Sequence, residues 1–359
     1  MSRRRAVVVA AAVVVLAGLA AAGLLAGAAD PPAGPVPPPS LVEEPAPSGY
    51  RLVWSDEFTG DALDPAKWNV RDDQNYGATL GVDQCYRAEN VAVHGGRLHL
   101  RLARKTVTCG GINPDTGEPT YYFTSGAVTT RADRDAPQRF AFTRGYVEAA
   151  IRLPQGNAYW GAFWHTGGDG APPWPEYGEL DVMEQDGGHP DLALQTVHYR
   201  CSTAASCDTG SDHRHNVRTG STDPGPPLTG VDAGTYPGAT TSRFVRYGLL
   251  WDEEQIAWYV DGEPVRGFDG ERVRRYATDA EGRVTVAHTG QARTPVRPSW
   301  PAVLDTSHAI DLNLAYGGAL PRSSGYTGGE TATGYDDGNV VGEREGTMEI
   351  EYVRVYQLP

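Results

Sequence analysis

From Tyr50 onward, the chain alternates short apolar runs with clusters of turn-forming residues. Residues 91–102 alternate apolar and polar positions on both sides of Gly95 and Gly96, which predicts a β-hairpin with the two glycines in its turn. Segments 52–54 and 349–356 are both strand-like, and we expect them to pair within one sheet. Similar patterns predict further strands at residues 145–153, 178–184, 195–199, 243–251, 256–260, 309–316 and 347–357.

The composition favours an all-β protein. The 359 residues include 44 Gly, 27 Pro and 18 Tyr, and these residues either disfavour helix interiors or favour strands. No internal repeat indicates a propeller or a solenoid. Strands that follow one another without intervening helices predict two antiparallel sheets packed face to face. We expect them to form one large domain at residues 49–359.

The N-terminus has the layout of an export signal. Met1 to Arg5 carry three arginines, and residues 6–29 are apolar and end in small residues. Residues 1–29 are therefore predicted to be a signal peptide or, if they are retained, a membrane anchor, because 24 apolar residues are enough to span a bilayer. Residues 30–48 are rich in proline and read as an extended linker. We expect a secreted, extracellular protein that meets a membrane only if the N-terminal segment is retained.

Four cysteines indicate disulfide bonds rather than a metal site, because an even number in an exported chain is typical of a disulfide framework. Four cysteines allow three pairings. Proximity in the sequence favours Cys85 with Cys109 and Cys201 with Cys207.

The charge argues against a nucleic-acid partner. The formal net charge is −14, and without residues 1–28 the chain keeps 45 acids against 28 bases, a charge of −17. Phosphate backbones would repel such a chain unless it carried a concentrated basic face, and the basic run at residues 272–275 is too short to form one. Neutral polymers remain possible ligands, and we expect a monomer.

Three acids interrupt an otherwise apolar strand at residues 178–184. Side chains alternate faces along a strand, so Glu179 and Asp181 share one face, whereas strict alternation would send Glu184 into the core. A one-residue bulge near Val182 and Met183 would return Glu184 to the acidic face. We predict that bulge.

Crowded acids suit glycoside hydrolysis. Mutual repulsion separates their pKa values, so one carboxylate can attack the anomeric carbon while a protonated one donates to the leaving oxygen. A gap of about 5–5.5 Å between the two would imply retention of configuration. The alternative is a structural or calcium-binding acidic edge of a lectin-like sandwich. Trp160, Trp164 and Trp174 favour catalysis, since sugars stack on flat apolar rings.

The residues from about Val53 to Gln357 resemble glycoside hydrolase family 16, and within it the laminarinase-like endo-β-1,3-glucanases. The signature Glu-x-Asp-x-x-Glu stands at residues 179–184. Six further segments occur in the order of the family: 53–58, 87–98, 125–149, 159–164, 312–318 and 352–356.

This resemblance implies an all-β, concanavalin A-like β-jelly-roll sandwich of two antiparallel sheets with a substrate cleft on its concave face. It implies a retaining reaction with Glu179 as nucleophile, Asp181 as its assistant and Glu184 as acid/base. The matching substrate-binding positions are Asn90, Trp160, Trp164, Trp174 and His198, of which His198 is expected beside the acid/base residue.

No cofactor is expected to be required. Many relatives bind one structural calcium ion, and the matching positions are Glu57, the carbonyl of Gly96 and Glu351. The last is commonly Asp in the family, so calcium is a possible cofactor only if the strand tolerates the longer side chain.

Residues 201–241 form an unusually long polar segment, which we expect to be a loop that covers part of the cleft. His213 and His215 within it could be metal ligands, although an HxH pair in a polar loop is more often solvated.

The sequence thus predicts an exported, endo-acting, retaining hydrolase of internal β-linkages in a polysaccharide, with β-1,3-glucan as the preferred substrate. Three alternatives stay open. The enzyme could act on another β-glycan, such as mixed-linkage glucan, a galactan or an agar-like polymer. It could be a transglycosylase, in which a sugar hydroxyl intercepts the intermediate. It could also be a non-catalytic carbohydrate-binding sandwich.

Overall fold

The structure is a computed structural model. Contacts between residues divide the chain into Met1–Glu44 and Pro45–Pro359. The predicted boundaries of the signal, the linker and the domain are not tested by this division. The structure describes residues 46–73, 81–110, 117, 119–154, 156, 158–171, 178–185, 193–200, 214–218, 243–269, 272–278, 283–291, 306–318, 320–321 and 346–359.

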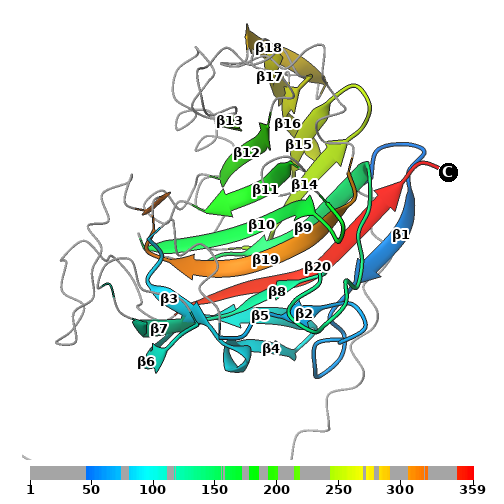
Figure 1. Cartoon of the computed structure of the whole chain (residues 1–359). Helices are drawn as coiled ribbons and strands as arrows, with labels where there is room; N and C mark the ends of the chain where they lie inside the picture. Colours follow the sequence, from blue (N-terminus) through cyan, green and yellow to red (C-terminus); the bar gives the residue numbers. More distant parts are fainter. Residues whose placement is uncertain are drawn as a thin grey trace, which may run out of the picture. The chain divides into compact units, whose positions relative to one another are not determined.

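The described residues are mainly β-strands (Figure 1). One short 3-10 helix, η2, spans Ala88–Asn90. The strands are β1 (Arg51–Asp56), β2 (Asn69–Val70), β3 (Gln84–Tyr86), β4 (Val91–His94), β5 (Arg97–Arg101), β6 (Ala103–Thr108), β7 (Thr120–Ser125), β8 (Ala127–Thr129), β9 (Gly145–Arg152), β10 (Tyr159–Gly167), β11 (Glu179–Gln185), β12 (Ala193–Arg200), β13 (Arg214–Arg218), β14 (Val245–Trp251), β15 (Ile256–Val260), β16 (Glu263–Phe268), β17 (Arg272–Thr278), β18 (Val284–Gln291), β19 (His308–Tyr316) and β20 (Thr347–Gln357).

Two large antiparallel sheets account for most of these strands. The ten-stranded sheet has the order β18-β17-β16-β15-β14-β9-β20-β5-β4, with β1 also paired to β20. The seven-stranded sheet has the order β13-β12-β11-β10-β19-β8-β2. Consecutive strands pair in the runs β14 to β18 and β10 to β13, whereas β9 with β20 and β10 with β19 pair strands that are distant in sequence. The predicted all-β jelly-roll sandwich is confirmed.

The core lies between the two sheets. Alternate residues of β9, such as Val147 and Ile151, and of β19, such as Ile310 and Leu314, are fully buried in one hydrophobic cluster. Nearly all residues of these two strands are buried, but only every second one belongs to this cluster, as the period of two requires. The opposite face of the seven-stranded sheet carries polar side chains of β10, β11, β12 and β19, and we call it the site face.

Several predicted strands are confirmed, and others were missed. Strands β15 and β20 have the predicted bounds, and β1 pairs with β20 as expected. The hairpin predicted at residues 91–102 is β4 and β5. The predicted loop at residues 201–241 contains β13, which pairs with β12 at the edge of the seven-stranded sheet, so that part of the segment is strand. The strands β16 to β18 were not predicted.

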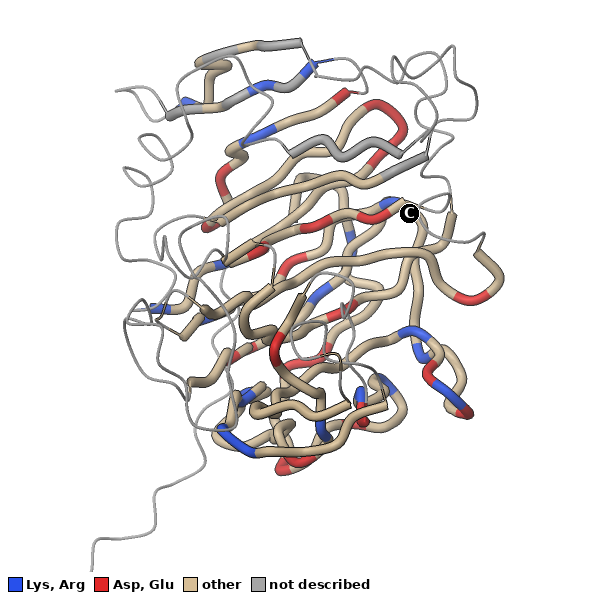
Figure 2. The backbone as a smooth tube through the Cα atoms, turned by 60° about the vertical axis from the view of Figure 1, so that its left-hand side comes forward, with Lys and Arg blue, Asp and Glu red and all other residues tan. Residues whose placement is uncertain are grey.

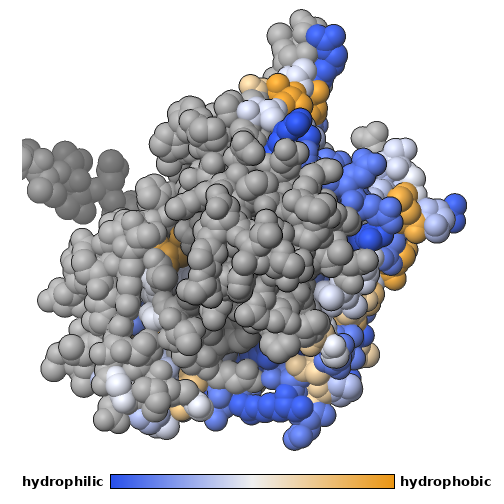
Figure 3. Space-filling view, turned by 45° about the horizontal axis from the view of Figure 1, so that its top comes forward, coloured by the Kyte–Doolittle hydropathy of each residue, from blue (hydrophilic) through white to orange (hydrophobic). Residues whose placement is uncertain are grey.

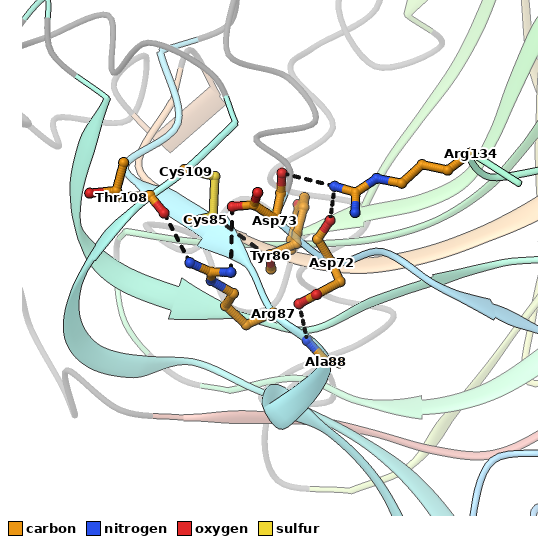
Figure 4. Close-up of a disulfide and its surroundings, with 9 residues drawn as sticks. All are labelled: Asp72, Asp73, Cys85, Tyr86, Arg87, Ala88, Thr108, Cys109 and Arg134. Atoms are coloured by element: carbon orange, nitrogen blue, oxygen red, sulfur yellow. Dashed lines mark hydrogen bonds and ion pairs between the residues drawn. A yellow bond between two sulfur atoms is a disulfide. The ribbon is translucent and has the colours of Figure 1, made fainter.

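A three-stranded sheet of order β3-β7-β6 carries the disulfide between Cys85 and Cys109, which confirms that pairing (Figure 4). The bond joins β3 to the residue just after β6. Beside it, Arg87 donates to the carbonyl of Thr108 at 2.9 Å and lies 3.4 Å from a carboxylate oxygen of Asp73. Cys201 and Cys207 lie outside the described residues.

The described surface exposes few large apolar side chains. Figure 3 shows hydrophobic atoms in small patches among hydrophilic ones on the described part of one face. The exposed members are Leu52, Val53, Val284, Val286 and Leu358. Among the described residues, no helix has the length and hydrophobicity to span a bilayer, and the predicted anchor at residues 6–29 lies outside them.

Candidate active site

Strand β11 brings the three predicted acids onto the site face. Opposite β10, Asp181 pairs with Trp164 and Glu184 pairs with Ala162, although the acids are three positions apart in sequence and their partners only two. The same shift occurs against β12. The extra residue is the predicted bulge, and both Val182 and Met183 are buried in the core. Figure 2 shows acidic residues, in red, at many places along the described backbone.

A tryptophan of the opposite sheet holds the bulge. The fully buried indole of Trp258, on β15, donates a hydrogen bond of 2.9 Å to the backbone carbonyl of Asp181. That carbonyl lies at the start of the register shift. An indole N–H can only donate, so the carbonyl of Asp181 has to point towards Trp258. No sequence pattern predicts this contact, because Trp258 is 77 residues from Asp181.

Glu179 and Asp181 share a cationic partner. The Nε2 atom of His198, on β12, lies 3.1 Å from Oδ2 of Asp181 and 3.6 Å from Oε1 of Glu179. Burial of the ring would lower its pKa, but the hydrogen bond to Asp181 and the charges of Asp181, Glu179 and Glu184 outweigh burial and raise the pKa of His198 to about 10. The ring is therefore an imidazolium at neutral pH.

His198 contacts more than one of the three acids. It lies opposite Glu179 in the β-ladder and is hydrogen-bonded to Asp181, and the charge of Glu184 also acts on the ring. Its place beside the acid/base residue stays a prediction, and its ion-pair contacts add the expected nucleophile and its assistant. The bulge displaces Glu184 along β11, so that Glu184 pairs with Leu194.

Glu184 has different contacts. Trp160 on β10 donates its indole N–H to Oε1 of Glu184 at 3.1 Å, and Thr196 on β12 donates its hydroxyl to Oε2 at 3.3 Å. Gly318 lies against the Trp160 ring: it has φ of +91°, and a Cβ there would come within 2.9 Å of the ring. The close approach explains why this position suits glycine.

Trp164 is held by β19. Its indole N–H donates to Oδ1 of Asn313 at 2.8 Å. Asp311, the ladder partner of Trp164, accepts from Arg71 at 3.3 Å, and Arg71 also contacts Asp133 at 3.0 Å. These charged groups are almost fully buried, and they extend the polar site face towards β2. Sequence analysis did not single out Arg71, Asp311 or the side chain of Asn313, because no local pattern shows that they meet.

Two further residues, Asn90 and Trp174, were predicted to bind substrate. Asn90 is buried, and its side-chain amide donates to the carbonyl of Arg101 at 2.9 Å, which ties η2 to the end of β5. A role of Asn90 in substrate binding stays a prediction. Trp174 and His213 lie outside the described residues, and the side chain of His215 is also outside them.

The residues expected to bind calcium are engaged by arginines. Arg354 donates to both carboxylate oxygens of Glu57, at 2.9 and 2.8 Å, and Arg97 donates to Glu351 at 3.2 Å. Gly96 has a positive φ in the turn between β4 and β5. Calcium prefers oxygen ligands whose charge is not already neutralised. With these contacts, the two carboxylates do not fit a calcium ion.

The Glu179, Asp181 and His198 cluster is compact enough to be considered for a metal. One ligand atom from each residue lies within 4.8 Å of the others. A protonated imidazole has no lone pair to offer a metal, and the raised pKa of His198 keeps the ring protonated. The cluster therefore fits two ionised carboxylates with one imidazolium.

Comparison with known proteins agrees with the site. The sequence model of glycosyl hydrolases family 16 matches residues 81–289, more than half of the chain. A glucan endo-1,3-beta-glucosidase A1 from Niallia circulans is 25% identical over 88% of this chain and 39% of its own length. A glucan endo-1,3-beta-glucosidase from Cryptopygus antarcticus is 28% identical over 84% of this chain and 90% of its own length.

A similar protein is found when the folds are compared. The catalytic domain of an endo-1,3-beta-glucanase (laminarinase) from Thermotoga petrophila RKU-1 is similar with a TM-score of 0.56 and 24% identity, over 86% of this chain and 98% of that one. The family match includes the strand with the three acids, whose alternation and bulge the structure describes. The chain therefore belongs to glycosyl hydrolases family 16, and it is a glycoside hydrolase.

Proposed function

We propose that this protein is an exported, endo-acting glycoside hydrolase that cleaves internal linkages of β-1,3-glucan with retention of configuration. The observation that carries the proposal is the division of the three acids between two environments. Glu179 and Asp181 lie beside an imidazolium, whereas Glu184 lies beside an indole and a hydroxyl. A retaining glycosidase needs one carboxyl group that stays ionised and one that exchanges a proton.

Glu179 is the nucleophile in this proposal. Its carboxylate attacks the anomeric carbon, and the bond from that carbon to the glycosidic oxygen breaks, which leaves a glycosyl ester on Glu179. His198 favours the ionised form of Glu179 before the attack. Once the ester has formed, Glu179 is neutral, and Asp181, at 3.1 Å, remains as the partner of the imidazolium. The positive charge of His198 is thus balanced in both states.

Glu184 is the acid and then the base. It gives its proton to the leaving oxygen in the first step, and in the second step its carboxylate takes a proton from the water that attacks the anomeric carbon. The ester then breaks and Glu179 returns as a carboxylate. Attack from opposite faces in two successive displacements retains the configuration.

The substrate class rests on the relatives and on the tryptophans. Both relatives named above are endo-1,3-beta-glucosidases of glucan by name. Trp160 and Trp164, on β10, lie on the same face of the sheet as the acids of β11. Flat apolar rings are suited to the C–H faces of sugars. These observations support a β-glucan as the substrate.

Export is supported by two features. Residues 1–29 have the layout of a signal peptide or anchor. The disulfide between Cys85 and Cys109 belongs to the oxidising conditions outside the cytoplasm.

The test is product release by the full chain from laminarin, mixed-linkage glucan and a β-galactan, with the Glu179→Gln variant alongside. We expect the wild type to release oligosaccharides from laminarin, with the β-anomer formed first in ¹H NMR spectra, and the variant to release none. If the wild type cleaved only mixed-linkage glucan or the β-galactan, that polymer would be the substrate instead of β-1,3-glucan. Longer products after addition of an acceptor sugar would indicate transglycosylation. Binding without turnover by either protein would indicate a carbohydrate-binding module and overturn the proposal.

A further inference from the structure

The hydroxyl of Thr196 is part of the immediate surroundings of Glu184. Thr196 is fully buried in β12, and its Oγ1 donates to Oε2 of Glu184 at 3.3 Å. Trp160 donates to the other oxygen, Oε1, at 3.1 Å. The two donors come from the strands on either side of β11, and together they hold both oxygens of one carboxyl group.

Two side chains of β12 bind two different acids of β11. Its site face presents His198 and Thr196, two residues apart. His198 lies opposite Glu179 and bonds Asp181, whereas Thr196 lies opposite Asp181 and bonds Glu184. Each side chain therefore contacts the acid one step further along β11 than its ladder partner. The bulge in β11 brings Glu184 within reach of Thr196.

The chemistry of the two contacts differs. An imidazolium carries a full charge and strongly opposes protonation of a carboxylate beside it. A hydroxyl is neutral, and it can donate to a carboxylate or accept from a carboxylic acid. Thr196 therefore favours the ionised form of Glu184 by one hydrogen bond without preventing protonation. Among the charged groups nearby, His198 on β12 is close enough to Glu184 for the charge of Glu184 to raise the pKa of the ring.

We propose that Thr196 is a positioning residue for Glu184, whose hydroxyl holds the carboxyl group in place through both of its protonation states. The proposal rests on the proposed function, in which Glu184 is first the acid and then the base. Loss of the hydroxyl removes a donor to the charged form, so the second step, which needs the ionised form, is affected more than the first.

The variants are Thr196→Val, Thr196→Ser and Thr124→Val in the full chain. Valine matches threonine in shape and branching and suits a strand. Thr124 is the matched control, because it is also fully buried in a strand and its hydroxyl has no hydrogen-bond partner among the described residues. Thr196→Ser keeps the hydroxyl and loses only a methyl group.

The first measurement is a ¹³C NMR titration of the side-chain carboxyl groups, with Glu184 assigned by the signal that disappears in Glu184→Gln. We expect Thr196→Val to raise the pKa of Glu184, because a hydrogen bond to the charged form is lost. Thr196→Ser and Thr124→Val should leave it in place. An unchanged value in Thr196→Val, or an equal shift in Thr124→Val, would overturn the proposal.

The second measurement is the pH profile of kcat and kcat/KM on laminarin. We expect Thr196→Val to lower kcat roughly tenfold, in line with one hydrogen bond to a charged group, and to lower KM with it. The alkaline limb of kcat/KM should move to higher pH. Equal losses in the valine and serine variants would mean that the hydroxyl is irrelevant. If the wild type cleaves no glycan, the proposed function fails, while the NMR titration still decides whether Thr196 acts on Glu184.

Discussion

The carboxylates on the two sheets have different partners. On the site face of the seven-stranded sheet, the contacts of Glu179 and Glu184 include an imidazole, an indole and a hydroxyl. On the ten-stranded sheet, Glu57 is bound by the guanidinium of Arg354 through two hydrogen bonds, and Glu351 is bound by Arg97. The same side-chain type therefore occurs in two kinds of environment.

The partners of a carboxylate distinguish a catalytic role from a structural one. A guanidinium is always charged, and that of Arg354 donates to both carboxylate oxygens of Glu57. A hydroxyl is neutral, and it can donate to a carboxylate or accept from a carboxylic acid. In the proposed mechanism, Glu184, the acid that has to exchange a proton, has neutral partners, whereas Glu179 lies beside the imidazolium of His198. The partners of a carboxylate thus indicate its role more clearly than the carboxylate itself does.

The largest expected effect comes from neutralising one acid of each kind. Glu179→Gln should lower kcat on the order of 10⁴-fold, because the amide cannot form the ester intermediate. Glu351→Gln, the control, should leave kcat unchanged. Both should stay folded, since the second variant breaks only a half-exposed ion pair, worth about 0–1 kcal/mol. Steady-state kinetics and thermal melts check this, and a comparable loss of kcat in Glu351→Gln would contradict the comparison.

The next effect concerns the support of the bulge. Trp258→Phe removes the donor to the carbonyl of Asp181 and leaves a buried acceptor without it, at a cost of about 1–3 kcal/mol in the free energy of unfolding. We expect kcat to fall as well, because the positions of Asp181 and Glu184 depend on the bulge.

Trp251→Phe is the control for that variant, since Trp251 is a buried indole of the same sheet that packs against His165 and His308. It should lower the stability and leave kcat in place. Chemical denaturation and kinetics on the two variants separate the effects. Equal losses of kcat would show that general packing is responsible.

A smaller effect is the pH dependence of stability. The folded pKa of His198, about 10, lies above the ordinary value of 6.5, so the folded state binds a proton that the unfolded state releases. The stabilisation is complete below pH 6.5 and is lost as the pH rises from there through about 10. Arg354, whose pKa is raised by its hydrogen bonds to Glu57, stays charged throughout this range.

Denaturation curves between pH 6 and 10 on the wild type and on His198→Gln test this prediction. The free energy of unfolding of the wild type should fall more steeply with pH than that of the variant. Parallel curves would refute a raised pKa for His198.

The smallest effect is expected from metal removal. Because Arg354 and Arg97 already engage Glu57 and Glu351, EDTA should leave the Tm of the wild type unchanged. Arg354→Gln should lower the Tm only slightly, because the pair is partly exposed. A clear fall in Tm with EDTA, reversed by added calcium, would show that an ion binds there after all.

The alternation of apolar and polar positions along the strands predicted much of the fold. It placed β15 and β20 at their bounds, and it required the bulge in β11, because an acid at position 184 conflicts with a core position. The strands β16 to β18 were missed, since their apolar positions are few and arginine-rich residues 272–275 do not resemble a strand. Strand β13 was missed because it lies within a polar segment that resembles a loop.

The candidate site could be predicted only as far as it is local. Glu179, Asp181 and Glu184 lie within six residues of one another and were found from the pattern alone. The contacts of Trp258 with Asp181 and of Trp164 with Asn313 join residues that are 77 and 149 positions apart. No local period reports such pairs, and the position of His198 depends on a register that the bulge alters.

The pairing of β1 with β20 has a consequence for how this unit combines with others. Arg51 and Gln357 are direct cross-strand partners, so the first and last strands of the sandwich begin and end at the same place. Segments whose ends lie side by side tolerate insertion into another polypeptide and circular permutation. A short connector between these two residues, with new ends opened in a surface turn such as the one at Gly95 and Gly96, would preserve every sheet.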